Sequence, residues 1–306
     1  MNVASTPRMR DPRRIDIDGV ETTYFEAGSG ETIFFVYGGH FGGADAGSSA
    51  QAWDLNFGPL SSQFRVVALD KLGQGRTGNP KRDEDYTMAA VVSHAAGLIK
   101  ALGLRDLHIV GHSRGAFAAT RLALEYPELT RSLTMVSSGT TSPLISTNEI
   151  RLAGSPHPFY TRESARFTYE GYCHDPRAVS EDWIDRSMEI SSLPRVPECM
   201  DKMYGEGLYF RTFIPNLARL KRETLQWLGE GRLQRPLQIF WGLNDQTADV
   251  GGAFELHDLV SPHQRVEVNI FGHCGHFPYR EHPARFNQLM SRFVRKVAAQ
   301  AEPAHA

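Results

Sequence analysis

A serine lies between two glycines in the segment Gly111-His112-Ser113-Arg114-Gly115, which has the spacing G-x-S-x-G. An apolar run, 107–110, precedes the segment and an alanine-rich helical pattern, 116–126, follows it, so the serine falls at a strand-to-helix turn. Such a turn exposes the hydroxyl at the positive end of a helix, where a developing oxyanion is stabilised. The segment predicts a nucleophilic serine, with an ordinary glycine-rich turn and a surface serine as the alternative.

A serine nucleophile needs a base, usually histidine, and a carboxylate that fixes the tautomer of that histidine. Two later β-rich runs, 236–241 and 266–270, are followed by Asp245 and by His276. The carboxyl ends of parallel strands open on one edge of a sheet, so Ser113, Asp245 and His276 are expected to converge there. The sequence therefore predicts a Ser-Asp-His triad.

Two neighbouring residues compete for these roles. His273 lies in the same loop as His276, but the segment after His276 leads directly into the last helix and leaves His276 on the exposed loop tip. We therefore take His276 as the base and His273 as a hydrogen-bonding neighbour or a loop residue. Asp245 or Asp249 acting only as a turn residue remains the alternative for the acid.

The order of elements predicts an α/β protein. Short β-rich runs alternate with helical patterns, and strand, helix, strand, helix in sequence favours a parallel sheet covered on both faces. The expected strands are 15–17, 22–26, 32–37, 65–70, 107–110, 132–136, 236–241 and 266–270. The expected helices are 53–60, 87–102 with a cap at Thr87, 116–126, 253–259 and 283–299.

Between residues 140 and 232 the β-branched runs disappear, and aromatic, charged and helix-capping residues replace them. We interpret residues 141–232 as a helical insertion into a core formed by residues 15–140 and 233–299. Residues 1–14, with arginines at 8, 10, 13 and 14, are expected to be a flexible arm, and residues 300–306 a disordered tail.

Composition excludes several classes of function. The 306 residues include 33 basic and 35 acidic ones, which give a formal charge of −2 and argue against nucleic acid as a partner. Three scattered cysteines favour a reducing compartment, and the absence of an apolar signal core or spanning run predicts a cytoplasmic protein with no membrane contact. No phosphate loop, G-x-G-x-x-G segment or metal cluster is visible, so no cofactor or metal is expected. The expected partner is a small-molecule substrate, with a homo-oligomer left open.

These motifs together resemble the α/β-hydrolase family. Gly111 to Gly115 matches the nucleophile elbow, Gly242-Leu243-Asn244-Asp245 matches the acid loop, and His276 with Glu281 and Pro283 matches the histidine segment. The resemblance implies a mostly parallel, eight-stranded type of sheet covered by helices, with the insertion as a helical cap. It also implies an oxyanion hole formed by the amides of Gly39, in the loop 38–43, and Arg114.

Within that family the chain is similar to the meta-cleavage product hydrolases, which cleave a carbon–carbon bond in ring-fission products of catechols. The glycine loop 38–43 and the cap stretch Asp185-Arg186 carry this narrower resemblance. It implies that Arg186, Phe277, Gly38 and His40 contact the substrate. Phe277 stands where those enzymes usually have tryptophan, Arg114 where they have a smaller or apolar residue, and Tyr37 where the wider family commonly has histidine.

Arg186 also stands out without the resemblance. Ser180 caps a predicted helix in which Trp183, Arg186 and Ile190 share one face, which places an arginine on an apolar stripe. Such an arginine needs an anion, either a substrate carboxylate or a carboxylate of the core. The expected function is hydrolysis of a 2-hydroxy-6-oxo-dienoate in aromatic catabolism. The rivals are a carboxylesterase or lactonase, and a non-catalytic binding protein with this fold.

Overall fold

The computed structural model describes residue 9, residues 11–43 and residues 47–301 of the 306-residue chain. Eight strands form one sheet in the order β1-β2-β4-β3-β5-β6-β7-β8. β1 pairs with β2 and β2 with β4 in antiparallel fashion, and all other pairs are parallel. The strands are β1 Arg13–Ile17, β2 Val20–Ala27, β3 Thr32–Val36, β4 Arg65–Leu69, β5 Leu107–His112, β6 Thr130–Val136, β7 Leu237–Gly242 and β8 Val266–Phe271.

The central strands are apolar because both of their faces are covered. Along β3, Ile33 and Phe35 pack in one buried cluster, whereas Phe34 and Val36 pack in another. This alternation follows from the two-residue period of a strand. The first cluster includes residues of α1 Asp54–Ser61 and α11 Pro283–Ala301, and these two helices contact each other.

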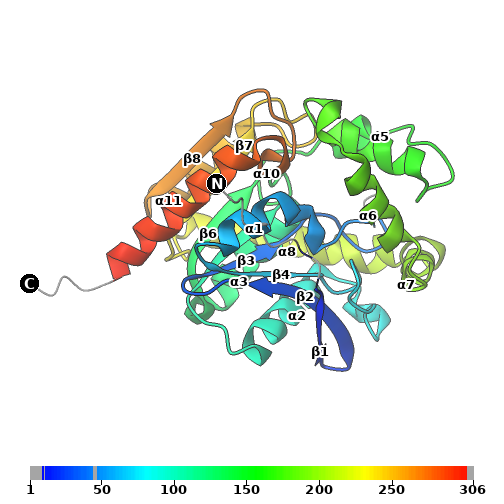
Figure 1. Cartoon of the computed structure of the whole chain (residues 1–306), viewed down its shortest axis with the longest axis horizontal. Helices are drawn as coiled ribbons and strands as arrows, with labels where there is room; N and C mark the ends of the chain where they lie inside the picture. Colours follow the sequence, from blue (N-terminus) through cyan, green and yellow to red (C-terminus); the bar gives the residue numbers. More distant parts are fainter. Residues whose placement is uncertain (1–8, 10, 44–46, 302–306) are drawn as a thin grey trace, which may run out of the picture.

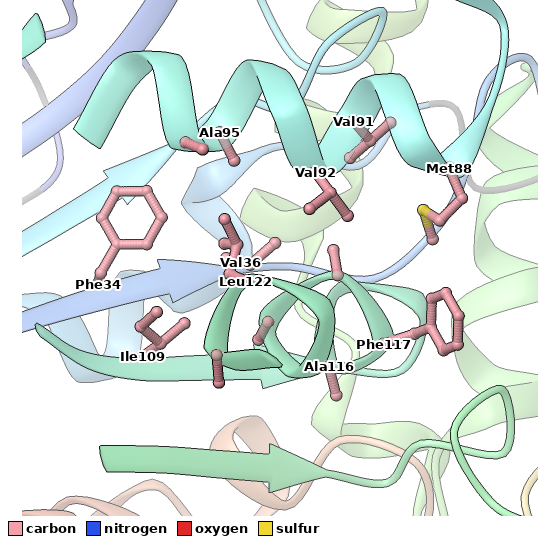
Figure 2. Close-up of a cluster of buried hydrophobic side chains, with 14 of the residues drawn as sticks. Phe34, Val36, Met88, Val91, Val92, Ala95, Ile109, Ala116, Phe117 and Leu122 are labelled. Carbon is pink, nitrogen blue, oxygen red and sulfur yellow. The ribbon is translucent and has the colours of Figure 1, made fainter. Parts of the chain in front are cut away.

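The second cluster fills the opposite face of the sheet. There α2 Met88–Ala101 packs against α3 Arg114–Glu125, and α9 Gly251–Val260 packs against β7 and β8. Figure 2 shows side chains of α2, β3, β5 and α3 meeting in this cluster. Thr87 caps α2, as the sequence predicts, because its side chain accepts a hydrogen bond from the amide of Ala90 at 3.1 Å.

A helical cap is inserted into the sequence between β6 and β7. It lies on the side of the molecule away from α11 (Figure 1). Ser180 caps α6 through the amide of Trp183, at 3.2 Å, as the sequence predicts. Short helical turns cover residues 201–205 and 209–213. The regular helices of the cap are α4 Asn148–Arg151, α5 Arg162–Tyr172, α6 Glu181–Ser191 and α7 Arg195–Met200.

The expected boundary of the cap needs correction. α8 Ile214–Gly229, which we placed in the insertion of residues 141–232, contacts α2, α3 and α9 and buries Leu220 and Leu228 in their cluster. α8 is therefore a helix of the core, and the cap ends near residue 213. The sequence pattern does not distinguish α8 from the helices of the cap, because all of them have a charged outer face.

The termini also differ from expectation. β1 begins at Arg13, inside the predicted flexible arm, and Arg13 donates to Glu26 at 2.5 Å. Arg14 lies 3.3 Å from Glu21 on the neighbouring strand. α11 continues to residue 301. The rest of the arm, apart from residues 9, 11 and 12, and the rest of the tail lie outside the described residues.

His94 on α2 makes the folded state sensitive to acid. It is buried against β2, with Nε2 2.9 Å from the hydroxyl of Thr22, and burial lowers the pKa of His94 to about 4. In the unfolded chain the pKa of His94 is about 6.5. Between about pH 6.5 and pH 4 the unfolded state therefore binds a proton that the folded state does not bind. The free energy of unfolding therefore falls as the pH drops from about 6.5 to 4.

We expect His94→Gln to reduce this acid sensitivity, because glutamine keeps a hydrogen-bonding group near Thr22 and does not titrate in this range. Urea unfolding at pH 7 and pH 4.5 measures it. The loss of stability between the two pH values should be about 2 to 3 kcal/mol smaller in the variant than in the parent protein. An equal loss in both proteins would contradict the assignment.

Candidate active site

Ser113 lies in a strained turn between β5 and α3. Its φ of 53° and ψ of −125° place a non-glycine residue in a rarely occupied backbone region. The flanking glycines are required by contact, because a Cβ on Gly111 would lie 2.4 Å from Cα of Ala116, and one on Gly115 would lie 2.2 Å from the carbonyl oxygen of Tyr37. This geometry explains the G-x-S-x-G spacing.

His276 and Asp245 meet, as the sequence predicts. Nδ1 of His276 donates to Oδ2 of Asp245 at 2.7 Å. The other carboxylate oxygen accepts from the amide and hydroxyl of Thr247, at 2.9 and 2.8 Å, and from the amide of Ala248, at 2.9 Å. The buried carboxylate is therefore fully hydrogen-bonded, and it sets both the tautomer and the ring orientation of His276.

The loop that carries His276 is held from two sides. The carboxylate of Glu281 accepts from the amides of Gly275 at 3.0 Å, of Phe277 at 3.2 Å and of His174 in the cap at 2.8 Å. The amide of His276 donates to the carbonyl of Tyr172 at 2.8 Å, and the two rings stack with centroids 4.9 Å apart. The end of α5 in the cap thus helps to position the histidine.

Two cavities open at Ser113, and Gly39, Ser113, Tyr172 and His276 line both of them. The aromatic cavity is also walled by Tyr37, Tyr169, Trp183, Phe277 and Tyr279. The polar cavity is also walled by Arg114, Thr140, Ser146, Asn148 and Thr247. Ser113 and the imidazole of His276 therefore lie where the aromatic cavity meets the polar cavity. This space can accept a ligand with one apolar end and one polar end.

The predicted glycine loop lies directly against the serine. A Cβ on Gly38 would come within 3.0 Å of Cβ of Ser113, and Gly38 lines the aromatic cavity. The buried ammonium of Lys71 donates to the carbonyls of Gly38 at 2.8 Å and Gly39 at 2.9 Å. The carbonyl of Gly38 and the N–H of Gly39 belong to the same peptide unit, and in a trans peptide these two groups point in opposite directions. Because Lys71 donates to the carbonyl of Gly38, the N–H of Gly39 points away from Lys71.

His40 differs from the expectation that it contacts substrate. In the part of the chain that the structure describes, it lines neither cavity, and its Nδ1 bonds to the guanidinium of Arg114 instead. Burial, together with the positive charges of Arg114 and Lys71, holds the pKa of His40 well below its usual value. His40 is therefore neutral at pH 7, and its Nδ1 accepts the hydrogen bond from Arg114.

The structure places Arg186, which was expected to contact the substrate, against carboxylates of the protein. Its guanidinium donates to Asp54 of α1 at 2.6 Å and pairs with Asp182 on its own helix. Arg280 donates to the other oxygen of Asp54, also at 2.6 Å. The sequence left two anions open for Arg186, a substrate carboxylate or a carboxylate of the core, and the structure provides the second in Asp54. Arg186 lines neither of the two cavities described above.

The competing loop residues have structural roles. The carbonyl of His273 accepts from the ring of His282 at 3.0 Å, and Asp249 accepts from the amide of Gly251 at 2.7 Å in the turn that begins α9. Neither residue lines the two cavities. The structure therefore keeps Asp245 with His276 and separates His273 and Asp249 from them.

Two residues of the site were missed by the sequence analysis: Lys71 and His112. His112 precedes the serine, and its Nε2 donates to the carbonyl of His276 at 2.9 Å. Burial and the neighbouring His276 hold the pKa of His112 well below its usual value, so its ring is neutral. The only available signal was its place inside G-x-S-x-G, since its partner lies 164 positions away in the sequence.

Among the described residues, no cluster of three or more histidine, cysteine, aspartate or glutamate side chains is arranged to hold a metal ion. Cys173, Cys199 and Cys274 are buried thiols. No helix in the described ranges combines the length and the apolar character needed to cross a membrane.

Comparison with known proteins agrees with this architecture. Residues 40–168 match the family model described as the alpha/beta hydrolase fold. The chain is 26% identical to 2-hydroxymuconate semialdehyde hydrolase of Pseudomonas sp. (strain CF600), over 94% of this chain and 95% of that protein. It is also 26% identical to 2-hydroxy-6-oxo-6-(2'-aminophenyl)hexa-2,4-dienoic acid hydrolase of Metapseudomonas resinovorans, over 94% of this chain and 91% of that protein.

A solved structure, the meta-cleavage product hydrolase CumD of Pseudomonas fluorescens IP01, superposes with a TM-score of 0.75 at 24% identity and covers 93% of this chain and 97% of that one. The sheet order, the matched family model and the superposition show that this chain has the α/β-hydrolase fold. Among proteins of that fold, it resembles the meta-cleavage product hydrolases.

Lys71 is a positioning residue for the glycine loop, and Lys71→Met tests this role. Methionine keeps the bulk but leaves the carbonyls of Gly38 and Gly39 without their donor, so the loop is expected to shift away from Ser113. For an activated aryl ester we expect kcat to fall on the order of tenfold or more with KM changed far less. Lys202→Met, at a lysine of the cap that pairs with Asp83, is the matched control. An unchanged kcat in a folded Lys71→Met protein would refute the role.

Proposed function

We propose that Ser113 is the nucleophile of a serine hydrolase, with His276 as its base and Asp245 as the residue that orients the base. The observation that carries this proposal is the strained turn at Ser113, which opens onto the same two cavities as His276. Because Nδ1 of His276 is engaged by Asp245, Nε2 is the nitrogen that takes the proton of the serine hydroxyl.

The amides of Gly39 and Arg114 form the proposed oxyanion hole. Arg114 begins α3, so its amide belongs to the positive end of that helix. Gly39 lines both cavities, and the contacts of Lys71 turn its amide away from the protein interior around that lysine. Two such donors stabilise the oxyanion that forms when a serine attacks a carbonyl.

The proposed reaction is hydrolysis of a carbon–carbon bond in a 2-hydroxy-6-oxo-dienoate, a ring-fission product of aromatic catabolism. Support comes from the relatives named above, whose printed names are hydrolases of such compounds, and from their coverage of nearly the whole chain. The aromatic cavity, which includes Phe277 and Gly38, places aromatic rings next to the position of the attacked carbonyl.

The reaction then has two stages. The dienol is first converted to its keto form, with His276 as the proton carrier. Ser113 next attacks the C6 ketone, and the bond from C6 to C5 breaks as its electron pair passes through the conjugated chain to the oxygen on C2, which takes up a proton. This step leaves an acyl-enzyme and releases a dienol acid. Water, deprotonated by His276, hydrolyses the acyl-enzyme and regenerates Ser113.

A second candidate is hydrolysis of a small apolar ester or lactone by the same triad. One observation favours it, because Arg186, which was expected to hold the dienoate carboxylate, is neutralised by Asp54 and Asp182. A cytoplasmic location, a small molecule as the sole partner and the possible homo-oligomer remain predictions from the sequence.

Turnover of the two substrate classes separates the candidates. We expect the purified protein to bleach the visible absorbance of a 2-hydroxy-6-oxo-6-aryl-hexadienoate with a kcat/KM at least tenfold above that for a p-nitrophenyl ester, because the dienoate has an apolar end and a polar end that match the walls of the two cavities. Ser113→Ala should bind the dienoate without forming products. Ester hydrolysis without dienoate cleavage would support the second candidate instead.

A further inference from the structure

The glycine loop 38–43 is held at its first end by the core. Lys71 donates to the carbonyls of Gly38 and Gly39, and Gly38 lies directly against Ser113. Both glycines line the aromatic cavity. The proposed function uses the amide of Gly39 as an oxyanion donor, and the position of that amide depends on how the whole loop is fixed.

The far end of the same loop is held by the cap. The hydroxyl of Tyr160 donates to the carbonyl of Gly42 at 2.8 Å. The backbone of α7 also contacts this glycine, because a Cβ on Gly42 would lie only 3.2 Å from Cα of Met200. Gly42 is buried and has a φ of 58°, so a residue with a side chain would fit poorly there. The loop is therefore clamped between the core at its first end and the cap at Gly42.

Tyr160 has a strained backbone at the start of α5. Its φ of 64° is rare for a residue with a bulky side chain, and such strain persists only where the surrounding contacts hold it. Thr161 follows directly and caps α5, because its side chain accepts from the amide of Ser164 at 3.2 Å. The strained residue therefore carries its phenol from the capped end of α5 to the glycine loop.

The opposite end of α5 bears on the histidine of the site. α5 ends at Tyr172, whose carbonyl accepts from the amide of His276 at 2.8 Å and whose ring stacks on the imidazole. The 11 residues of α5 form a rod about 16 Å long. One helix of the cap thus connects the glycine loop to the loop of His276.

We propose that Tyr160 is a positioning residue for the proposed oxyanion hole, and that α5 couples this hole to His276. The phenol hydroxyl fixes the glycine loop, so the amide of Gly39 faces the attacked carbonyl only while the cap is closed on the loop. The same closure seats Tyr172 against His276. This inference rests on the proposed function of Ser113 and adds that the cap is needed for the chemical step as well as for covering the cavities.

Tyr160→Phe tests this role, because it removes one hydroxyl and keeps the ring. For p-nitrophenyl acetate we expect kcat to fall about tenfold with KM changed less than about twofold, since the oxyanion donors act on the transition state and not on the bound ester. Tyr126→Phe is the matched control. It removes the same group at the far end of α3, where the ring packs under Lys100, and it should keep the kcat and KM of the parent protein.

Hydrogen exchange of residues 38–43 is a second measurement that needs no turnover. The loop should exchange on the order of fivefold faster in Tyr160→Phe than in the parent protein or in Tyr126→Phe, because the hydrogen bond to Gly42 is lost. An unchanged kcat in Tyr160→Phe, an equal fall in Tyr126→Phe, or unchanged exchange of the loop would overturn the proposal. If the parent protein hydrolyses no ester, the proposed function of Ser113 fails, and the exchange rates still decide whether Tyr160 holds the loop.

Discussion

The site depends on the tight turn that takes the chain from β5 into α3 at Ser113. The turn exists because two glycines let the backbones of β3, β5 and α3 approach to distances that no Cβ would permit. Packing on both sides of the sheet keeps these elements in place, and this packing supports the positive φ of Ser113. The packed turn holds Ser113 at the junction of the two cavities, whereas a serine in a flexible surface loop would move away from it.

The second constraint is the link between the histidine loop and the cap. Glu281 accepts amide hydrogens from both segments, and the carbonyl of Tyr172 accepts from His276. The cap therefore does more than cover the cavities, because its α5 terminus shares the hydrogen bonds that orient His276. The cap and the histidine loop are in this way held together by shared hydrogen bonds.

Much of the fold was predictable because buried strands leave continuous apolar runs and helix caps leave short local signals, as at Thr87 and Ser180. Ser113, Asp245 and His276 were predictable because each follows a strand of a parallel sheet. The partners of buried charged side chains were not predictable from the sequence. Helical spacing placed Arg186 on the face of α6 but gave no information on Asp54, 132 positions earlier, and the contacts of Lys71 exist only in the folded chain.

The central claim is that Ser113 is an activated nucleophile, and mass spectrometry after treatment with a fluorophosphonate tests it most directly. The account predicts one covalent adduct per chain, located on the peptide that contains Ser113, formed quickly in the parent protein and much more slowly in His276→Ala. Absence of an adduct in the folded protein, or an adduct on a different residue, would contradict the account.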